Sequence, residues 1–204
     1  MTDVIRARPN FEWQVAAVNR VERLLKTVTA ALDAAGIPYA VIGGNAVATW
    51  VATRDVGAVR ATKDVDLLLD RADVPRAAAA LAPHGFDSIE VRGLPVFVEA
   101  DDPLPSQGVH VVLANEPVRV NDRQSAPDLS QVVRSDSGFL VLDLLRLVTM
   151  KLNVYRRIDQ VHMEDLLRVG LIDAELAARL PDDLLPQLRE IRDTMEWFTP
   201  PPQF

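Results

Sequence analysis

The stretch from Tyr39 to Asp70 constrains the fold more than any other part of the chain, because two short apolar runs in it adjoin residues that can bind a phosphate and a cation. The first run, residues 39–42, predicts a buried strand that ends at Gly43-Gly44. Glycines tolerate a positive φ and let a ligand approach the backbone closely. Asn45 is a typical capping residue for a helix over 46–51, and the amide groups at a helix start favour anions. We therefore expect a strand, a turn and a helix that together can hold phosphate.

The second apolar run carries two carboxylates. Residues 64–69 read Asp-Val-Asp-Leu-Leu-Leu, and the period of two in a strand places Asp64 and Asp66 on the same face. Two neighbouring carboxylates repel each other unless a cation or hydrogen-bond donors compensate, and their oxygens suit Mg²⁺ held together with substrate phosphates. Each half also has a simpler interpretation, since a Gly-Gly pair is a common turn and an Asp-x-Asp strand can present a solvated face.

The order of these features is more specific than either half. Strand, Gly-Gly, helix, basic and hydroxyl residues and then Asp-x-Asp resembles the nucleotidyltransferase superfamily, which has the DNA polymerase beta-like fold. The resemblance implies a metal-dependent transfer of a nucleoside monophosphate from an NTP, with Mg²⁺ or Mn²⁺ held by the Asp pair. It also implies that the substrate is bound by Gly43, Gly44, Asn45, Arg60 and Thr62.

A second group of candidate residues lies in the segment 140–172. Leu144, Leu147, Val148 and Leu152 follow helical spacing, and Lys151 lies among them. On one helix Lys151 and Tyr155 share a face, as do Asp159 and His162 if the helix continues or restarts there. Alternatively, Lys151 extends its charge to solvent and the charged residues that follow form an ion-paired surface.

The pattern MKL…R-R-x-D-x-x-H-x-x-D-L in this segment resembles the toxin-type, AbiEii-like bacterial branch of the superfamily. That resemblance implies that Lys151 binds nucleotide phosphates and that Asp159 orients Lys151 or the substrate. His162 and Asp165 would then support these two residues.

The usual third carboxylate of the superfamily is not apparent. In the corresponding run, residues 108–113, the candidate position holds His110. Imidazole is a poor ligand for Mg²⁺ and suits Mn²⁺ or Zn²⁺ better, so we keep His110 as a candidate metal ligand. Glu99 or Asp101 could substitute for it, and a histidine among apolar residues is also often structural.

The remaining pattern predicts an α+β fold, with a small mixed, mostly antiparallel sheet flanked by helices and a helical bundle after it. We expect a long helix over 11–35, a helix over 73–81 and a hairpin of 86–91 with 95–98. The stretch 115–136 is expected to be a loop. Residues 1–120 would form the N-terminal helix and nucleotidyltransferase-like core, and 121–204 a helical region packed on it.

Composition limits the setting. The 204-residue chain has no cysteine, which excludes disulfides and thiolate metal sites, and no apolar leader or membrane span is apparent. We expect a cytoplasmic, bacterial protein that does not enter a membrane. Its net charge of −7 argues against a broad nucleic-acid surface. An RNA or tRNA partner would need a local basic patch, for which the candidates are Arg54, Arg60, Lys63, Lys151, Arg156 and Arg157; the alternative is that these residues pair with nearby carboxylates.

Three functional hypotheses follow from the sequence. The first is a nucleotidyltransferase acting on an acceptor hydroxyl of RNA or tRNA, a protein or a small molecule. The second is a nucleotide-binding protein with impaired catalysis, and the third is a toxin-antitoxin or assembly partner without catalysis. The apolar helices could also form the interface of a homodimer.

Overall fold

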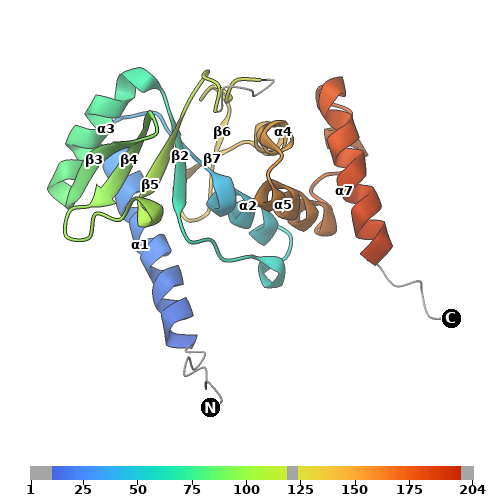
Figure 1. Ribbon diagram of the computed structural model, residues 1–204, viewed down its shortest axis with the longest axis horizontal. Helices are drawn as coiled ribbons and strands as arrows, with labels where there is room; N and C mark the ends of the chain where they lie inside the picture. Colours follow the sequence, from blue (N-terminus) through green and yellow to red (C-terminus); the bar gives the residue numbers. More distant parts are fainter. Residues whose placement is uncertain (1–10, 119–123, 199–204) are drawn as a thin grey trace, which may run out of the picture.

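The computed structural model describes residues 11–118 and 124–198, and it contains a seven-stranded sheet with helices packed against it (Figure 1). The strands are β1 Ala40–Ile42, β2 Val65–Leu69, β3 Phe86–Val91, β4 Leu94–Glu99, β5 Val109–Leu113, β6 Val132–Arg134 and β7 Leu140–Leu142. The α-helices are α1 Phe11–Ala34, α2 Gly43–Ala52, α3 Val74–Leu81, α4 Leu144–Val154, α5 Arg157–Arg168, α6 Ala174–Ala177 and α7 Leu185–Phe198. Short 3₁₀ helices are η1 Val56–Ala58, η2 Arg71–Asp73, η3 Ala82–His84, η4 Pro105–Gln107 and η5 Asp182–Leu184.

The sheet is mixed, and its order is β3-β4-β5-β2-β1-β7-β6. β2 pairs with β5 and β1 with β7 in parallel, while the other neighbouring pairs are antiparallel. This confirms the predicted α+β class with a mostly antiparallel sheet. In the central register Asp66 lies opposite Ile42 on β1 and opposite His110 on β5. The end of β1 and two candidate metal ligands are therefore side by side.

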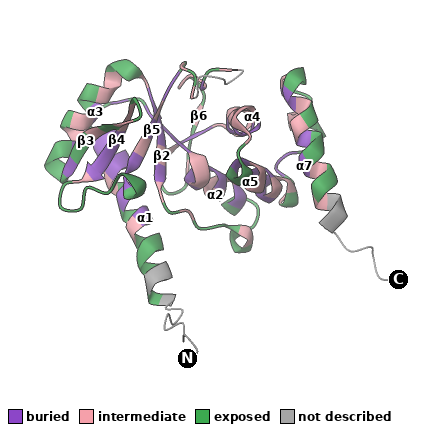
Figure 2. Cartoon of the chain, in the orientation of Figure 1, coloured by how far each residue is buried: buried purple, intermediate pink, exposed green. Residues whose placement is uncertain are grey.

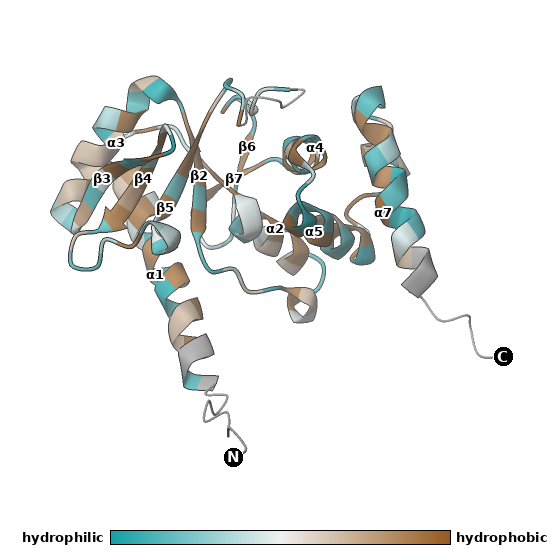
Figure 3. Cartoon of the chain, viewed as in Figure 1, coloured by the Kyte–Doolittle hydropathy of each residue, from teal (hydrophilic) through white to brown (hydrophobic). Residues whose placement is uncertain are grey.

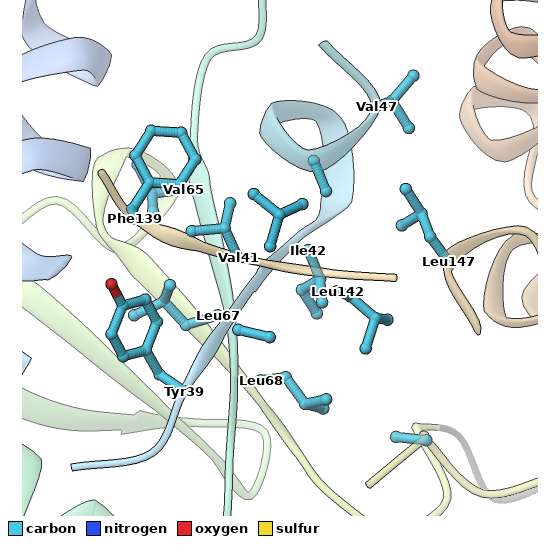
Figure 4. Packing of buried hydrophobic residues seen from close by; sticks show 14 of the residues in the cluster. Tyr39, Val41, Ile42, Val47, Val65, Leu67, Leu68, Phe139, Leu142 and Leu147 are labelled. Carbon is cyan, nitrogen blue, oxygen red and sulfur yellow. The ribbon is translucent and has the colours of Figure 1, made fainter. Parts of the chain in front are cut away.

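The core fills the centre of the sheet. Buried residues colour the central strands purple in Figure 2, and these strands are largely brown, that is hydrophobic, in Figure 3. Figure 4 shows how Val41 and Ile42 of β1 pack among Val65, Leu67 and Leu68 of β2. All five side chains are buried because helices cover the central strands, which explains why β2 reads as a continuous apolar run after Asp66.

Most predicted elements are confirmed. The long amphipathic helix is α1, whose second half is buried through Leu24, Val28 and Leu32, while Val15 and Val18 in its first half are exposed. The hairpin is β3 with β4. The predicted loop over 115–136 was wrong in part, because β6 lies within it and pairs with β7; a three-residue strand is too short for apolar periodicity to reveal.

The helix that carries Lys151 ends sooner than its apolar pattern indicated. Tyr155 has a φ of 50°, so the chain leaves α4 in the left-handed conformation and restarts as α5 at Arg157. The expectation that Lys151 and Tyr155 share a helix face is therefore wrong. Tyr155 instead turns towards α7, where its hydroxyl lies 3.2 Å from the carbonyl of Gln187 and 3.0 Å from Glu190.

The C-terminal segment is joined to the sheet as well as to the helices. β7 pairs with β1, and α5 contacts α2, α4 and α7. The sheet thus contains strands from both sides of the predicted boundary at 120, and the division into 1–120 and 121–204 stays a prediction. Among the described residues, none of the helices has the length and apolar character needed to cross a bilayer.

Candidate functional site

The glycine pair forms the start of α2. Gly43 follows β1 directly with a φ of 66°, and a Cβ atom there would lie 2.7 Å from the carboxylate carbon of Asp66. A Cβ on Gly44 would lie 2.8 Å from Oγ1 of Thr62. Contacts this short are not tolerated, so the site needs glycine at Gly43 both for its backbone conformation and for the approach of Asp66.

Asn45 does not have the expected role. The residue before the helix is Ile42, which has no side-chain cap, and Asn45 lies inside α2. Its Nδ2 donates a hydrogen bond of 2.8 Å to the backbone carbonyl of Asp64 and so ties α2 to the start of β2. The first amides of α2 consequently have no side-chain cap, which is the state in which a helix start can bind an anion.

Asp64, Asp66 and His110 form a compact group. One ligand atom from each lies within 4.8 Å of the others, as the parallel pairing of β2 and β5 requires. Burial first, and then the charge of Asp64, raise the pKa of Asp66. Thr62 donates a hydrogen bond of 3.2 Å to Asp64. Such a group has uncompensated negative charge and the donor atoms for a divalent cation.

A hydrogen bond to a backbone carbonyl orients the imidazole of His110. Its Nε2 lies 2.8 Å from the carbonyl oxygen of Pro105 in η4. Because a carbonyl oxygen only accepts hydrogen bonds, Nε2 carries the proton and Nδ1 keeps the free lone pair, which is the common arrangement behind a metal-binding histidine. No local pattern in the sequence indicates this contact, because the position of the short helix η4 depends on the fold.

The two acidic residues considered as substitutes for His110 do not join this group. Glu99, at the end of β4, forms an ion pair of 2.8 Å with Arg23 of α1, and Asp101 is exposed. In the described parts of the chain, the group of potential metal ligands consists of Asp64, Asp66 and His110.

Lys151 and Asp159 form a buried ion pair beside the acidic group. Their Nζ and Oδ1 atoms are 2.9 Å apart, and the side chains are only 5% and 1% exposed. Arg156 donates to Oδ2 of the same carboxylate at 2.8 Å. Burial alone would raise the pKa of Asp159, but hydrogen bonds from Arg156 and the charge of Lys151 lower it overall. Asp159 therefore stays ionised and holds both cations in place.

Arg60 and Asp165 form a separate pair. The guanidinium of Arg60 donates two hydrogen bonds to the carboxylate of Asp165, at 2.9 and 3.0 Å. This geometry fastens the segment before β2 to α5. Arg60, Lys151 and Arg156 are thus paired with carboxylates, whereas Arg54, Lys63 and Arg157 have no such pair in the described part of the chain.

These residues line one pocket of about 500 Å³ between α2, β2, β5 and the two helices α4 and α5. The pocket brings together residues that are far apart in the sequence: Gly43, Gly44, Arg60, Thr62, Lys63, Asp64, Asp66, His110, Lys151, Arg156, His162 and Asp165. Asp159 lies behind Lys151, and Asn45 lines a second cavity, of about 780 Å³, between α1, α2 and the turn from β6 to β7. The Asp pair and Lys151 therefore line the same pocket.

Comparisons with known proteins bear on the fold. No protein-family model matches the chain, and no curated protein matches its sequence. The solution structure of the antibiotic-resistance factor ANT(2'')-Ia superposes with a TM-score of 0.52 at 14% identity, over 89% of this chain and 95% of that one. An antigenic nucleotidyltransferase-like protein from Paracoccidioides brasiliensis gives a TM-score of 0.52 at 14% identity, over 89% of this chain and 92% of the other.

At this level of identity the similarity concerns the fold. These comparisons do not test the resemblance to the AbiEii-like branch, and membership of that branch stays a prediction. The mixed sheet with its flanking helices is the architecture of these neighbours, so the protein has the nucleotidyltransferase fold.

Proposed function

We propose that the protein is a metal-dependent nucleotidyltransferase that moves a nucleoside monophosphate from an NTP to an acceptor hydroxyl. The observation that carries this proposal is the convergence of the uncapped start of α2 and the group Asp64, Asp66 and His110 in one pocket. The fold agrees with this proposal, but function within a fold must be argued from the site. This site has groups that can bind both a triphosphate and a cation.

The residues present fit a divalent cation. Asp64 and Asp66 offer carboxylate oxygens and His110 offers a ring nitrogen, and burial together with the charge of Asp64 raises the pKa of Asp66. The expected ion is Mg²⁺ or Mn²⁺. When bound, it would neutralise charge on the triphosphate and align the attacking and leaving oxygens.

The chain's own groups would position the substrate. The first amides of α2, from Gly43 to Asn45, would bind the phosphates, and Lys151 and Arg156 supply positive charge in the same pocket. The acceptor oxygen forms a bond to the α-phosphorus, the bond to pyrophosphate breaks, and the acceptor proton passes to a carboxylate of the Asp pair. Positioning and electrostatics carry most of such a transfer.

The net charge of the protein limits the class of acceptor but does not identify it. Because the net charge is −7, a small molecule, a protein hydroxyl or the end of an RNA such as tRNA fits better than a long nucleic-acid surface. We place this activity in a bacterial cytoplasm. The proposed protein partner is a second copy of the chain or a cognate toxin-antitoxin partner.

A second candidate function is nucleotide binding with impaired catalysis. It is favoured by His110, because imidazole replaces a hard oxygen donor at the third ligand position. This candidate predicts binding of an NTP without turnover. A toxin-antitoxin or assembly role without catalysis predicts neither.

The test is calorimetric titration of each NTP, with Mg²⁺ or Mn²⁺, into the wild type and an Asp64→Asn, Asp66→Asn double variant. We expect metal-dependent binding that the variant loses, followed by transfer of label from the bound NTP. A matched control is Asp87→Asn with Glu90→Gln, which removes two exposed charges from β3. If wild type and the Asp64/Asp66 variant bind NTP equally, the proposal is wrong.

A further inference from the structure

His162 is buried in the pocket wall and has no hydrogen-bond partner among the residues that the structure describes. It lies on α5, and its Nε2 would be 3.6 Å from a Cβ placed on Gly44 at the start of α2. The side chain is 8% exposed. Its Nδ1 is enclosed and unpaired, and Nε2 also makes no hydrogen bond within the described part of the chain.

An unpaired polar group inside a protein costs free energy, so buried histidines are normally hydrogen-bonded. The two other buried charged groups of α5, Asp159 and Asp165, each have partners. His162 is therefore the exception on this helix. A partner outside the chain is the simplest reason for keeping a histidine here, where a leucine would avoid the cost.

The two ring nitrogens differ in what they can reach. Nδ1 is sealed from the pocket, whereas Nε2 faces Gly44 among the pocket residues. Orphaned buried N–H groups are rarer than unsatisfied acceptors. The proton therefore belongs on Nε2, which makes Nε2 a donor directed at the space beside the first turn of α2.

His162 is uncharged at neutral pH. Burial first, and then the charge of Lys151, lower its pKa to about 4. It can therefore add a hydrogen bond to an anion without adding a third cation to Lys151 and Arg156. The anion would be held between the amides of α2 on one side and Nε2 on the other.

We propose that His162 donates a hydrogen bond from Nε2 to a phosphate oxygen of a nucleoside triphosphate bound at the start of α2. This inference rests on the proposed function and deepens it, because it assigns His162 direct contact with the substrate instead of a supporting role behind Lys151. It also identifies the phosphate chain, and not the base, as the part of the nucleotide that lies between α2 and α5.

The test uses the magnesium complexes of inorganic triphosphate and of ATP, titrated calorimetrically into the full chain. His162→Leu removes the donor at similar volume, and His162→Gln keeps an N–H donor. We expect the leucine variant to lose about tenfold in affinity for both ligands and the glutamine variant to stay within about threefold of wild type. His84→Leu, on an exposed turn, is the control and should bind as wild type.

Two further measurements separate binding from packing. Chemical denaturation should show that His162→Leu is at least as stable as wild type, because the unpaired group is gone; a structural histidine would give a less stable variant. Nitrogen-15 spectra should show the His162 proton on Nε2, with a shift on adding magnesium triphosphate.

Unchanged affinity in His162→Leu, or a loss for ATP but not for inorganic triphosphate, would overturn the inference. The outcome is distinguishable from failure of the proposed function. If the wild type binds no triphosphate, both are wrong; if binding requires Asp64 and Asp66 but not His162, only the role of His162 is wrong.

Discussion

The two walls of the pocket differ in whether their charged side chains form ion pairs. On the sheet wall, defined by Asp64, Asp66 and His110, neither carboxylate has a basic side chain within ion-pair distance in the described parts of the chain. On the helix wall, defined by Lys151, Arg156 and Asp159, each charge has an opposite charge within 3 Å. The difference indicates that the helix wall is held together by its own ion pairs and keeps one net positive charge, whereas the sheet wall needs a cation to balance it.

This contrast assigns different tasks to residues that the family resemblance places in one site. Lys151 and Asp159 are a preassembled unit, so their mutation should show first in stability. Asp64 and Asp66 repel each other in the unliganded protein, so their mutation should show in ligand binding. Four predictions test that separation.

Replacing Asp159 should have the largest effect. In Asp159→Ala the buried Lys151 loses its partner, and we expect a loss of about 3–5 kcal/mol in the free energy of unfolding, measured by urea denaturation. Glu164→Ala, which breaks an exposed pair with Arg168, should cost less than about 1 kcal/mol. A loss as small as that of the control would show that Lys151 finds solvent or another partner.

The same pair predicts an acid transition. The pKa of Asp159 is lowered from its ordinary value of 3.8, so its contribution is complete above that pH and disappears as the pH falls below it. The wild type should lose stability in that range more steeply than Asp159→Asn.

The second prediction concerns the contact between the glycine turn and the sheet wall. Gly43→Ala forces a side chain into a positive φ and against Asp66, and we expect a cost of about 3 kcal/mol together with loss of metal binding. Gly36→Ala is matched, because Gly36 has a φ of 60° and nothing within 4 Å of a Cβ. Its cost should be about 1 kcal/mol. Equal costs for the two variants would mean that Asp66 moves aside freely.

The third prediction tests a residue that lies between the walls. Arg60→Gln should lower the unfolding free energy by about 1.5 kcal/mol, because half of the Arg60 side chain is exposed and the charged bonds to Asp165 are partly screened. NTP affinity should change less than threefold, since Arg60 is already engaged. A larger loss of affinity would show that Arg60 leaves Asp165 for the substrate, as the family resemblance implies.

The sequence predicted the elements of the sheet wall because their signals are local. A short apolar run, two glycines and an alternating Asp-x-Asp each report a backbone property of neighbouring residues, and the structure places them as expected. Asn45 was misassigned because Ser, Thr, Asp and Asn are preferred caps, yet its side chain satisfies the carbonyl of Asp64 instead. This role of the Asn45 side chain depends on a contact with a residue 19 positions away in the sequence.

The helix wall was less predictable for a related reason. The pairing of Lys151 with Asp159 depends on the turn at Tyr155, where a tyrosine adopts a conformation usually found in glycine or asparagine. Apolar spacing indicates a helix but not the residue at which the backbone turns left-handed and the helix ends. The pairing of Arg60 with Asp165 spans 105 positions and has no local signal at all.

The fourth prediction reverses the usual sign of a mutation. Burial and the charge of Asp64 raise the pKa of Asp66, so its ionised form destabilises the folded protein at pH 7. Asp66→Asn should therefore be more stable than the wild type in chelator, because the variant removes a buried charge that lies beside Asp64. With excess Mn²⁺ the order should invert, because the cation stabilises only a protein that binds it. Thermal unfolding with EDTA and with Mn²⁺ measures both. If the variant is less stable in EDTA, Asp66 already has a compensating partner, and the contrast between the two walls disappears.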